Sequence, residues 1–179
     1  MSRRMLIATH NSATGERGQG FLSWLVSPFS KCQSKTLAEQ WEAGCRYFDI
    51  RYKWSDKRGC YICAHGLWES ERSLREVLAE IDELGKCYVM VTCERGAPLP
   101  KSAIRHIIAN HVNICFTYFS RKKPRWKLDY CNIQMPHING YQMLGWHDWH
   151  TLIPIPHLWK CFYKEPPMNE DKFTFIDFL

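Results

Sequence analysis

The amino-acid sequence predicts an α/β fold, in which helices cover a mainly parallel β-sheet. Short apolar runs with the composition of buried strands alternate along the chain with amphipathic runs that have helical spacing. The chain has 179 residues, of which 45% are hydrophobic and 23% charged. This composition is globular, and the length suits one domain with a core. We therefore expect residues 1–179 to form a single domain.

Six runs have the character of strands: residues 5–9, 45–51, 60–64, 86–94, 114–119 and 173–179. The run at 86–94 is continuously apolar, which is typical of a strand covered on both faces of a parallel sheet. A complete (β/α)₈ barrel usually needs about 250 residues. A barrel in this chain must therefore be irregular and reduced, with short or missing helices.

Three runs have the character of helices: residues 36–44, 73–85 and 101–112. The first two begin with capping boxes, formed by Thr36 with Glu39 and by Ser73 with Glu76. Each of these two runs also ends at a glycine, which commonly terminates helices. Residues 10–20 are rich in Gly and Ser and are expected to form a loop. Residues 120–172 give a weak pattern that predicts no definite element.

The nine cysteines are odd in number, and most lie in apolar runs, which favours buried thiols over a disulfide framework. Cys60 and Cys63 form a C-x-x-C pair within a predicted strand. No second pair follows at zinc-site spacing, so we do not expect metal binding there.

The net charge of +6 favours an anionic partner, such as a phosphate group or a membrane surface. Residues 120–127, which contain five basic residues and Trp126, are a candidate for peripheral membrane contact, although a solvated loop would have the same composition. No nucleic-acid partner is expected, because no recognition motif accompanies the charge. No apolar run is long enough to span a bilayer, and the apolar run near the start is too short for a secretory signal. We therefore expect a cytoplasmic protein.

Polar and titratable residues stand where the predicted strands end: His10 and Asn11, Asp49 and Arg51, His65, Glu94 and Arg95, and Asp177. In parallel α/β folds the carboxyl ends of the strands meet at one edge, where functional groups collect. Two histidines can transfer protons near neutral pH, and an arginine can stabilise charge on a phosphoryl group. This set of residues predicts phosphodiester cleavage without a metal ion.

Three stretches in order, "IATHNSATG", "CQSKTLAEQWEAGCRYFDIR" and "AHGLWESERSLREVLAEIDE", resemble the catalytic X-type domain of phosphatidylinositol-specific phospholipase C. The resemblance covers about residues 5–95, and the chain is similar to a short bacterial-type member. It implies the irregular TIM barrel of phospholipase C-like phosphodiesterases. It also implies a lyase or hydrolase that acts on phosphatidylinositol or a related lipid.

The resemblance also implies a role for each residue of the site. His10 would be the general base that deprotonates the inositol 2-hydroxyl, and His65 would be the general acid for the departing diacylglycerol. Arg51 would hold the phosphate, with Asp49 in the same cluster, and Asp177 would orient His10. The first product would be a cyclic inositol phosphate.

Asn11, Glu94 and Arg95 are expected to bind substrate. Calcium-dependent relatives bind the ion through residues at these strand ends, so Asn11, Asp49 and Glu94 are alternative calcium ligands. Arg51 stands where those enzymes carry a further acidic ligand, and an arginine repels a divalent ion. We therefore expect no cofactor, with calcium as the alternative.

Two other functions stay open at this point. The chain could be a non-catalytic module that binds a phospholipid headgroup, or a calcium-dependent phosphodiesterase with a different headgroup specificity. Under each reading the partner is an anionic phospholipid or a soluble phosphodiester.

Overall fold

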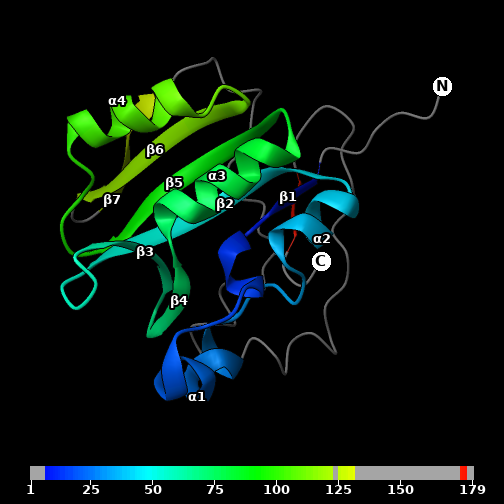
Figure 1. Cartoon of the computed structure of the whole chain (residues 1–179), viewed down its shortest axis with the longest axis vertical. Coiled ribbons are helices and arrows are strands. Elements are labelled where there is room, and N and C mark those ends of the chain that lie inside the picture. The colour runs from blue at the N-terminus through cyan, green and yellow to red at the C-terminus, as the bar shows by residue number, and fades with distance from the viewer. Residues whose placement is uncertain (1–6, 123–124, 132–173, 177–179) are drawn as a thin grey trace.

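The computed structural model describes residues 7–122, 125–131 and 174–176, and the side chains of residues 7–118 (Figure 1). The strands in these ranges form one eight-stranded mixed sheet. Figure 1 shows helices lying across one face of this sheet.

The centre of the sheet is parallel, as the alternating pattern predicts. The strand β1 (Ile7–Thr9) pairs with β2 (Cys45–Ser55), which pairs with β5 (Cys87–Arg95), which pairs with β6 (Ile114–Lys122). The short strand β8 (Thr174–Ile176) pairs with the other side of β1, also in parallel. All of these strands therefore point their carboxyl ends toward the same edge of the sheet.

The strand β3 (Cys60–His65) departs from the expectation of a parallel sheet, because it pairs with β2 in the antiparallel direction. The prediction ended the second strand at Arg51, but β2 continues to Ser55, and only residues 56–59 connect it to β3. A connection this short can form a hairpin, whereas a parallel crossover needs a dozen or more residues.

Two further antiparallel strands were not predicted. The strand β4 (Trp68–Ser73) pairs with β3, and β7 (Arg125–Cys131) pairs with β6. Charged and polar residues alternate through β4, which obscured the strand in the sequence. Within the described residues β7 and β8 lie at opposite ends of the sheet, which is open. Closure into a barrel stays a prediction.

The two helices with predicted capping boxes form where these boxes place them. Thr36 caps α2 (Leu37–Glu42) and Ser73 caps α3 (Leu74–Leu84), each with the reciprocal bond from the glutamate three residues later. The helix α4 (Lys101–Asn110) follows β5. In Figure 1, α3 and α4 cover the same face of the sheet.

The predicted loop at 10–20 contains a 3₁₀ turn, η1 (Ser12–Gly15), and the beginning of an unpredicted helix, α1 (Gly20–Ser30). Phe21, Trp24, Leu25 and Phe29 have helical spacing, which could have indicated this helix. Pro28 inside the run obscures this signal, since proline usually breaks a helix interior. No helix in the described part of the chain is long and apolar enough to cross a membrane.

The main core lies between the sheet and helices α2, α3 and α4, and it contains Leu37, Phe48, Leu78, Val91 and Ile104 among other buried residues. The seven cysteines from Cys32 to Cys115 are free, and five of them are buried, which agrees with the expectation of buried thiols. Burial raises the pKa of Cys63 to about 12 and that of Cys45 to about 11, so these two thiols are not reactive thiolates at neutral pH.

Candidate active site

The strands bring four of the predicted site residues to one edge of the sheet. His10 directly follows β1, Arg51 lies in β2, and Glu94 lies near the end of the neighbouring strand β5. His65 comes from the antiparallel strand β3: because Cys63 pairs with Tyr52, the end of β3 runs back toward this cluster. The β2–β3 hairpin thus brings His65 to the edge of the sheet where a parallel third strand was expected to place it.

His10 is buried and is held beside an arginine and a carboxylate. Arg51 NH2 lies 2.7 Å from His10 Nε2, and Arg51 Nε donates to Asp49 Oδ2 at 3.3 Å. The same Asp49 oxygen lies 3.7 Å from His10 Nε2. A guanidinium group can only donate, so His10 Nε2 is the acceptor and carries a lone pair. This is the tautomer in which Nε2 can accept a proton.

His65 faces His10 across the cluster, with the ring centroids 6.4 Å apart and the rings at 75°. Its Nδ1 lies 2.7 Å from the backbone oxygen of Ser30, the last residue of α1. A carbonyl oxygen only accepts, so Nδ1 carries hydrogen and Nε2 faces the site. Burial lowers the pKa of His65, Arg51 lowers it further, and the Ser30 carbonyl opposes the shift.

Asn11 lies between the two histidines. Its backbone has a left-handed conformation, with φ of 48°, and its N–H donates to Asp49 Oδ2 at 3.2 Å. Its amide nitrogen lies 3.1 Å from His10 Nε2 and 3.3 Å from His65 Nε2. Its Oδ1 is buried and has no hydrogen-bond partner in the described part of the chain. Asn11 is therefore placed to fix the spacing between the two rings.

Glu94 and Arg95 hold the loop that follows His65. Glu94 Oε2 lies 3.5 Å from Arg51 NH1, and Glu94 Oε1 accepts from the Gly66 N–H at 3.4 Å. Arg95 NH2 donates to the Gly66 carbonyl at 2.6 Å. Glu94 therefore joins the arginine of the site to the turn beside His65, while Arg95 points at the turn. Their predicted role in substrate binding stays a prediction.

The alternative calcium site stays a prediction, and the position of Arg51 bears on it. The guanidinium of Arg51 lies between Asp49 and Glu94, at 3.3 and 3.5 Å from their carboxylates. It thus takes the position that a cation between these two groups would need. In the ranges that the structure describes, no group of three or more His, Cys, Asp or Glu side chains is arranged to hold a metal ion.

The last residue of α1 and the residues just after the helix supply contacts that the sequence did not predict. Besides the Ser30 carbonyl, Cys32 Sγ accepts from the Asn11 amide at 3.2 Å, and Gln33 Nε2 donates to the His10 carbonyl at 2.9 Å. Gln33 belongs to a stretch that resembles the phospholipase family, so a signal for it existed. No sequence signal could identify the Ser30 carbonyl, because every residue has one.

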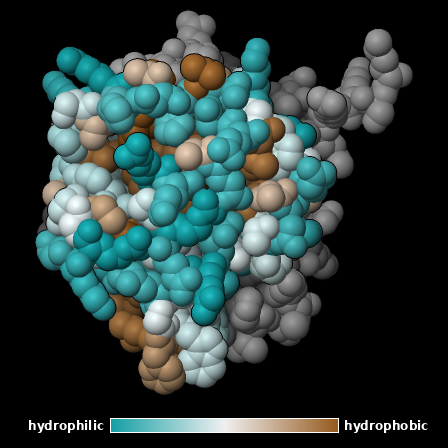
Figure 2. All heavy atoms as spheres, viewed as in Figure 1, coloured by the Kyte–Doolittle hydropathy of each residue, from teal (hydrophilic) through white to brown (hydrophobic). Residues whose placement is uncertain are grey.

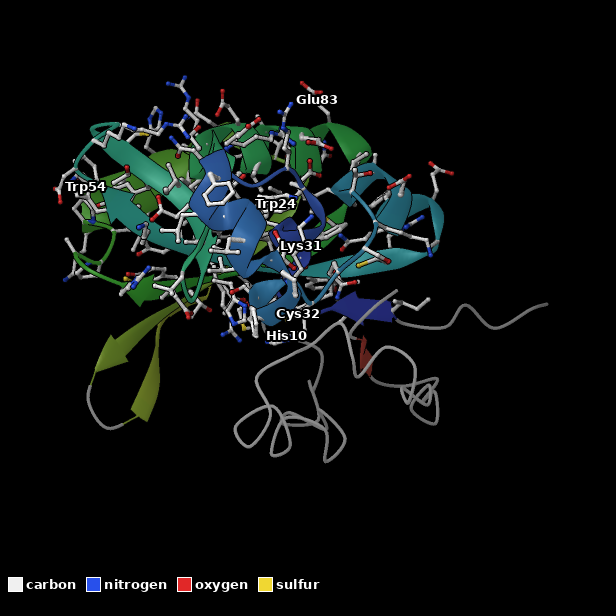
Figure 3. All side chains as sticks on the ribbon, turned by 90° about the horizontal axis from the view of Figure 1, so that it is seen from below. His10, Trp24, Lys31, Cys32, Trp54 and Glu83 are labelled. Atoms are coloured by element: carbon white, nitrogen blue, oxygen red, sulfur yellow. The ribbon has the colours of Figure 1, made fainter. Side chains whose placement is uncertain are left out.

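Two predictions fall wholly or partly on residues that the structure leaves undescribed. Asp177 lies outside the described residues, although Ile176, just before it, pairs with Thr9, just before His10. Of residues 120–127, those at 120–122 and 125–127 pair as the strands of a hairpin between β6 and β7. Figure 3 shows this hairpin projecting on the same side of the sheet as His10.

Solved structures share this fold. A mutant of phosphatidylinositol-specific phospholipase C from Staphylococcus aureus matches with a TM-score of 0.52 and 15% identity, over 75% of this chain and 55% of that one. A double mutant of the same enzyme gives 0.52 and 15%, over 74% and 54%. The Listeria monocytogenes enzyme gives a TM-score of 0.45 and 18% identity, over 70% of this chain and 57% of that one.

No family model and no curated protein matches the sequence. The matches to the Staphylococcus aureus structures show that the chain has a phosphatidylinositol-specific phospholipase C-like fold. The chain spans about half the length of these structures.

Proposed function

We propose that the protein is a phosphodiesterase that cleaves a phosphatidylinositol-like phosphodiester by acid–base catalysis and forms a cyclic inositol phosphate. One observation carries this proposal: two imidazoles face each other at 6.4 Å, with the Arg51 guanidinium bonded to one of them. A module that only binds a headgroup would need the arginine but not a pair of histidines.

The first step assigned to this chain is proton removal by His10. Its Nε2 lone pair already accepts from Arg51. When the substrate phosphate takes the N–H groups of Arg51, Nε2 becomes available to the inositol 2-hydroxyl. The hydroxyl oxygen then attacks phosphorus, and its proton moves to Nε2. Asp49, which is fully buried, keeps Arg51 and the Asn11 backbone in place during this step.

The leaving oxygen receives its proton from His65. The P–O bond to diacylglycerol breaks as the new P–O bond forms, and the Nε2–H of protonated His65 is given to the departing oxygen. The Ser30 carbonyl holds Nδ1 and supports the positive ring. Burial and Arg51 lower the pKa of free His65, so a bound phosphate anion, which offsets Arg51, favours the protonated acid.

A membrane surface is the proposed partner, because the lipid substrate resides there. Phe21, Trp24, Leu25 and Phe29 of α1 are exposed on the surface, and Figure 2 shows apolar side chains gathered at the end of the molecule where α1 lies. Exposed apolar patches of this kind mark interaction sites. The hairpin at 120–127 stays the proposed basic contact with anionic lipid.

Activity on phosphatidylinositol in mixed micelles, followed by phosphorus NMR, tests the proposal. The parent protein should form the cyclic product in the presence of chelator. His10→Ala and His65→Ala should each lower the rate by about 10²–10⁴-fold while circular dichroism and the melting temperature show a retained fold.

Arg51→Lys tests the phosphate contact, because a point charge cannot reproduce the paired N–H groups of a guanidinium. Its rate should fall well below that of the parent. Headgroup binding without turnover by the parent would instead identify a non-catalytic module. Activity that is lost with chelator and restored by calcium would show that an ion, and not Arg51, carries the phosphate charge.

A further inference from the structure

A cavity lies beside α1, apart from the acid–base cluster. It has a volume of about 410 Å³, within the range of small-molecule sites. Gly20, Trp24, Ser27 and Lys31 line one side of it, and their spacing places them on one face of the α1 helix and its end. None of the lining residues belongs to the histidine–arginine cluster. Trp24 and Lys31 are labelled in Figure 3.

The charge in this cavity is unbalanced. Arg17 and Lys31 are its two cations, and Glu71 is its one anion. Glu71 pairs with Arg17, with Oε1 at 3.3 Å from Nε. No residue in the described part of the chain accepts a hydrogen bond from Lys31 Nζ. Burial lowers the pKa of Lys31, and the negative charge of Glu16, which does not line the cavity, opposes this. The cavity is therefore suited to an anion that can accept from the ammonium group.

The rim of the cavity is apolar and aromatic. Phe21 and Trp24 are 72% and 68% exposed, and their ring centroids lie 5.5 Å apart. Leu25 continues the exposed apolar surface on the same helix. A free anion in water would gain nothing from such a rim. An anion that is attached to apolar chains would gain contact with both parts.

From the cavity, its unpaired lysine and its aromatic rim, we infer that this cavity is an accessory site for the phosphate group of a membrane phospholipid. The site holds a lipid that is not the substrate. The inference names a partner for the membrane contact proposed above and rests on that contact, but not on catalysis. Lys31 supplies the ammonium group, and Phe21 and Trp24 lie against the glycerol and acyl region.

Vesicles of phosphatidylcholine containing phosphatidylglycerol, a lipid that the proposed reaction does not cleave, test this inference by co-sedimentation. Lys31→Gln removes the ammonium group and should weaken vesicle binding about tenfold, the loss expected for one hydrogen bond to a charged group. Lys57→Gln is the matched control, since Lys57 is exposed in the β2–β3 turn outside the cavity. It should change binding less than twofold. Equal losses in the two variants would overturn the site.

Competition separates lipid phosphate from a soluble anion. Dihexanoylphosphatidylglycerol below its micelle concentration should displace the parent protein from vesicles at a lower concentration than inorganic phosphate does. It should displace the Lys31→Gln variant poorly. Inorganic phosphate that competes equally well would show a soluble-anion site and overturn the lipid assignment.

The accessory-site inference and the catalytic proposal can be overturned independently of each other. Lys31→Gln should cleave a soluble, short-chain phosphodiester at the parent rate, and His10→Ala should retain vesicle binding. If the parent shows no cleavage but the lysine variants still differ in vesicle binding, the catalytic proposal fails and the accessory site stands.

Discussion

Helices α1 and α3 carry similar apolar stripes and use them in opposite ways. In α3, Leu74, Val77, Leu78 and Ile81 are buried against the sheet. In α1, the apolar residues at helical spacing face outward, and their exposed fractions range from 48% at Phe29 to 72% at Phe21. The buried residues of α1 are two serines, Ser23 and Ser30.

The two helices also begin and end differently. A capping box starts α3, and Gly85 ends it with a φ of 126°. Gln19 precedes α1 without a side-chain cap, and the last carbonyl of α1 accepts from His65. The comparison teaches that an apolar stripe specifies a surface to be covered, but not whether the core or an outside partner covers it.

The largest expected effect is on stability. Leu78→Ala in α3 should lower the free energy of unfolding by about 2–5 kcal/mol, because it leaves a cavity in the core. Leu25→Ala in α1 makes the same change on an exposed side chain and should alter it by less than about 0.5 kcal/mol. Urea titrations of the two variants measure both values. Similar losses would mean that α1 also packs its apolar face against the protein.

The next effect concerns what α1 contacts outside the molecule. Trp24→Ala should weaken binding to lipid vesicles by about tenfold, or about 1.4 kcal/mol, because a large aromatic surface is no longer removed from water. Trp54→Ala is the control, since Trp54 is partly exposed on β2 and far from α1 in Figure 3. If both variants bind as the parent does, α1 is not the membrane contact.

A smaller effect on stability distinguishes the capped start of α3 from the start of α4, which has no side-chain cap. Ser73→Ala removes the side chain that accepts from the Glu76 N–H and should cost about 1 kcal/mol of stability. Ser102→Ala, an exposed serine in the first turn of α4, should be nearly neutral. Thermal unfolding of the two variants gives the comparison. An equal shift in both melting temperatures would show that the capping box does not stabilise α3.

The smallest effect is on the pH dependence of stability, and it comes from His65, which contacts the last carbonyl of α1. The pKa of His65 is lowered in the folded state, so the unfolded chain binds more protons as the pH falls below about 6.5. This contribution to stability is therefore complete above that pH and is lost as the pH falls through the lowered value.

His65→Gln should flatten the decline in the free energy of unfolding between pH 7 and pH 5. His106→Gln, on the exposed surface of α4, is the control for the loss of a histidine. Parallel pH curves for the parent and both variants would argue against a buried neutral His65.

Much of the site could be predicted because strand ends in a parallel sheet have a known meeting place. His10, Asp49, Arg51 and Glu94 lie together as that rule requires. His65 was predicted for the right place with the wrong strand direction. A histidine at the end of a short apolar run has the same sequence signal in a hairpin as in a parallel strand.

The sequence by itself determined the elements whose signals are local. Capping boxes fixed the starts of α2 and α3, and continuous apolar runs fixed β5 and β6, because these patterns depend on neighbouring residues alone. Only the tertiary structure decided that α1 faces outward and that the Ser30 carbonyl partners His65. A backbone carbonyl is the same in every residue, and the direction of an apolar face depends on which distant segments cover it.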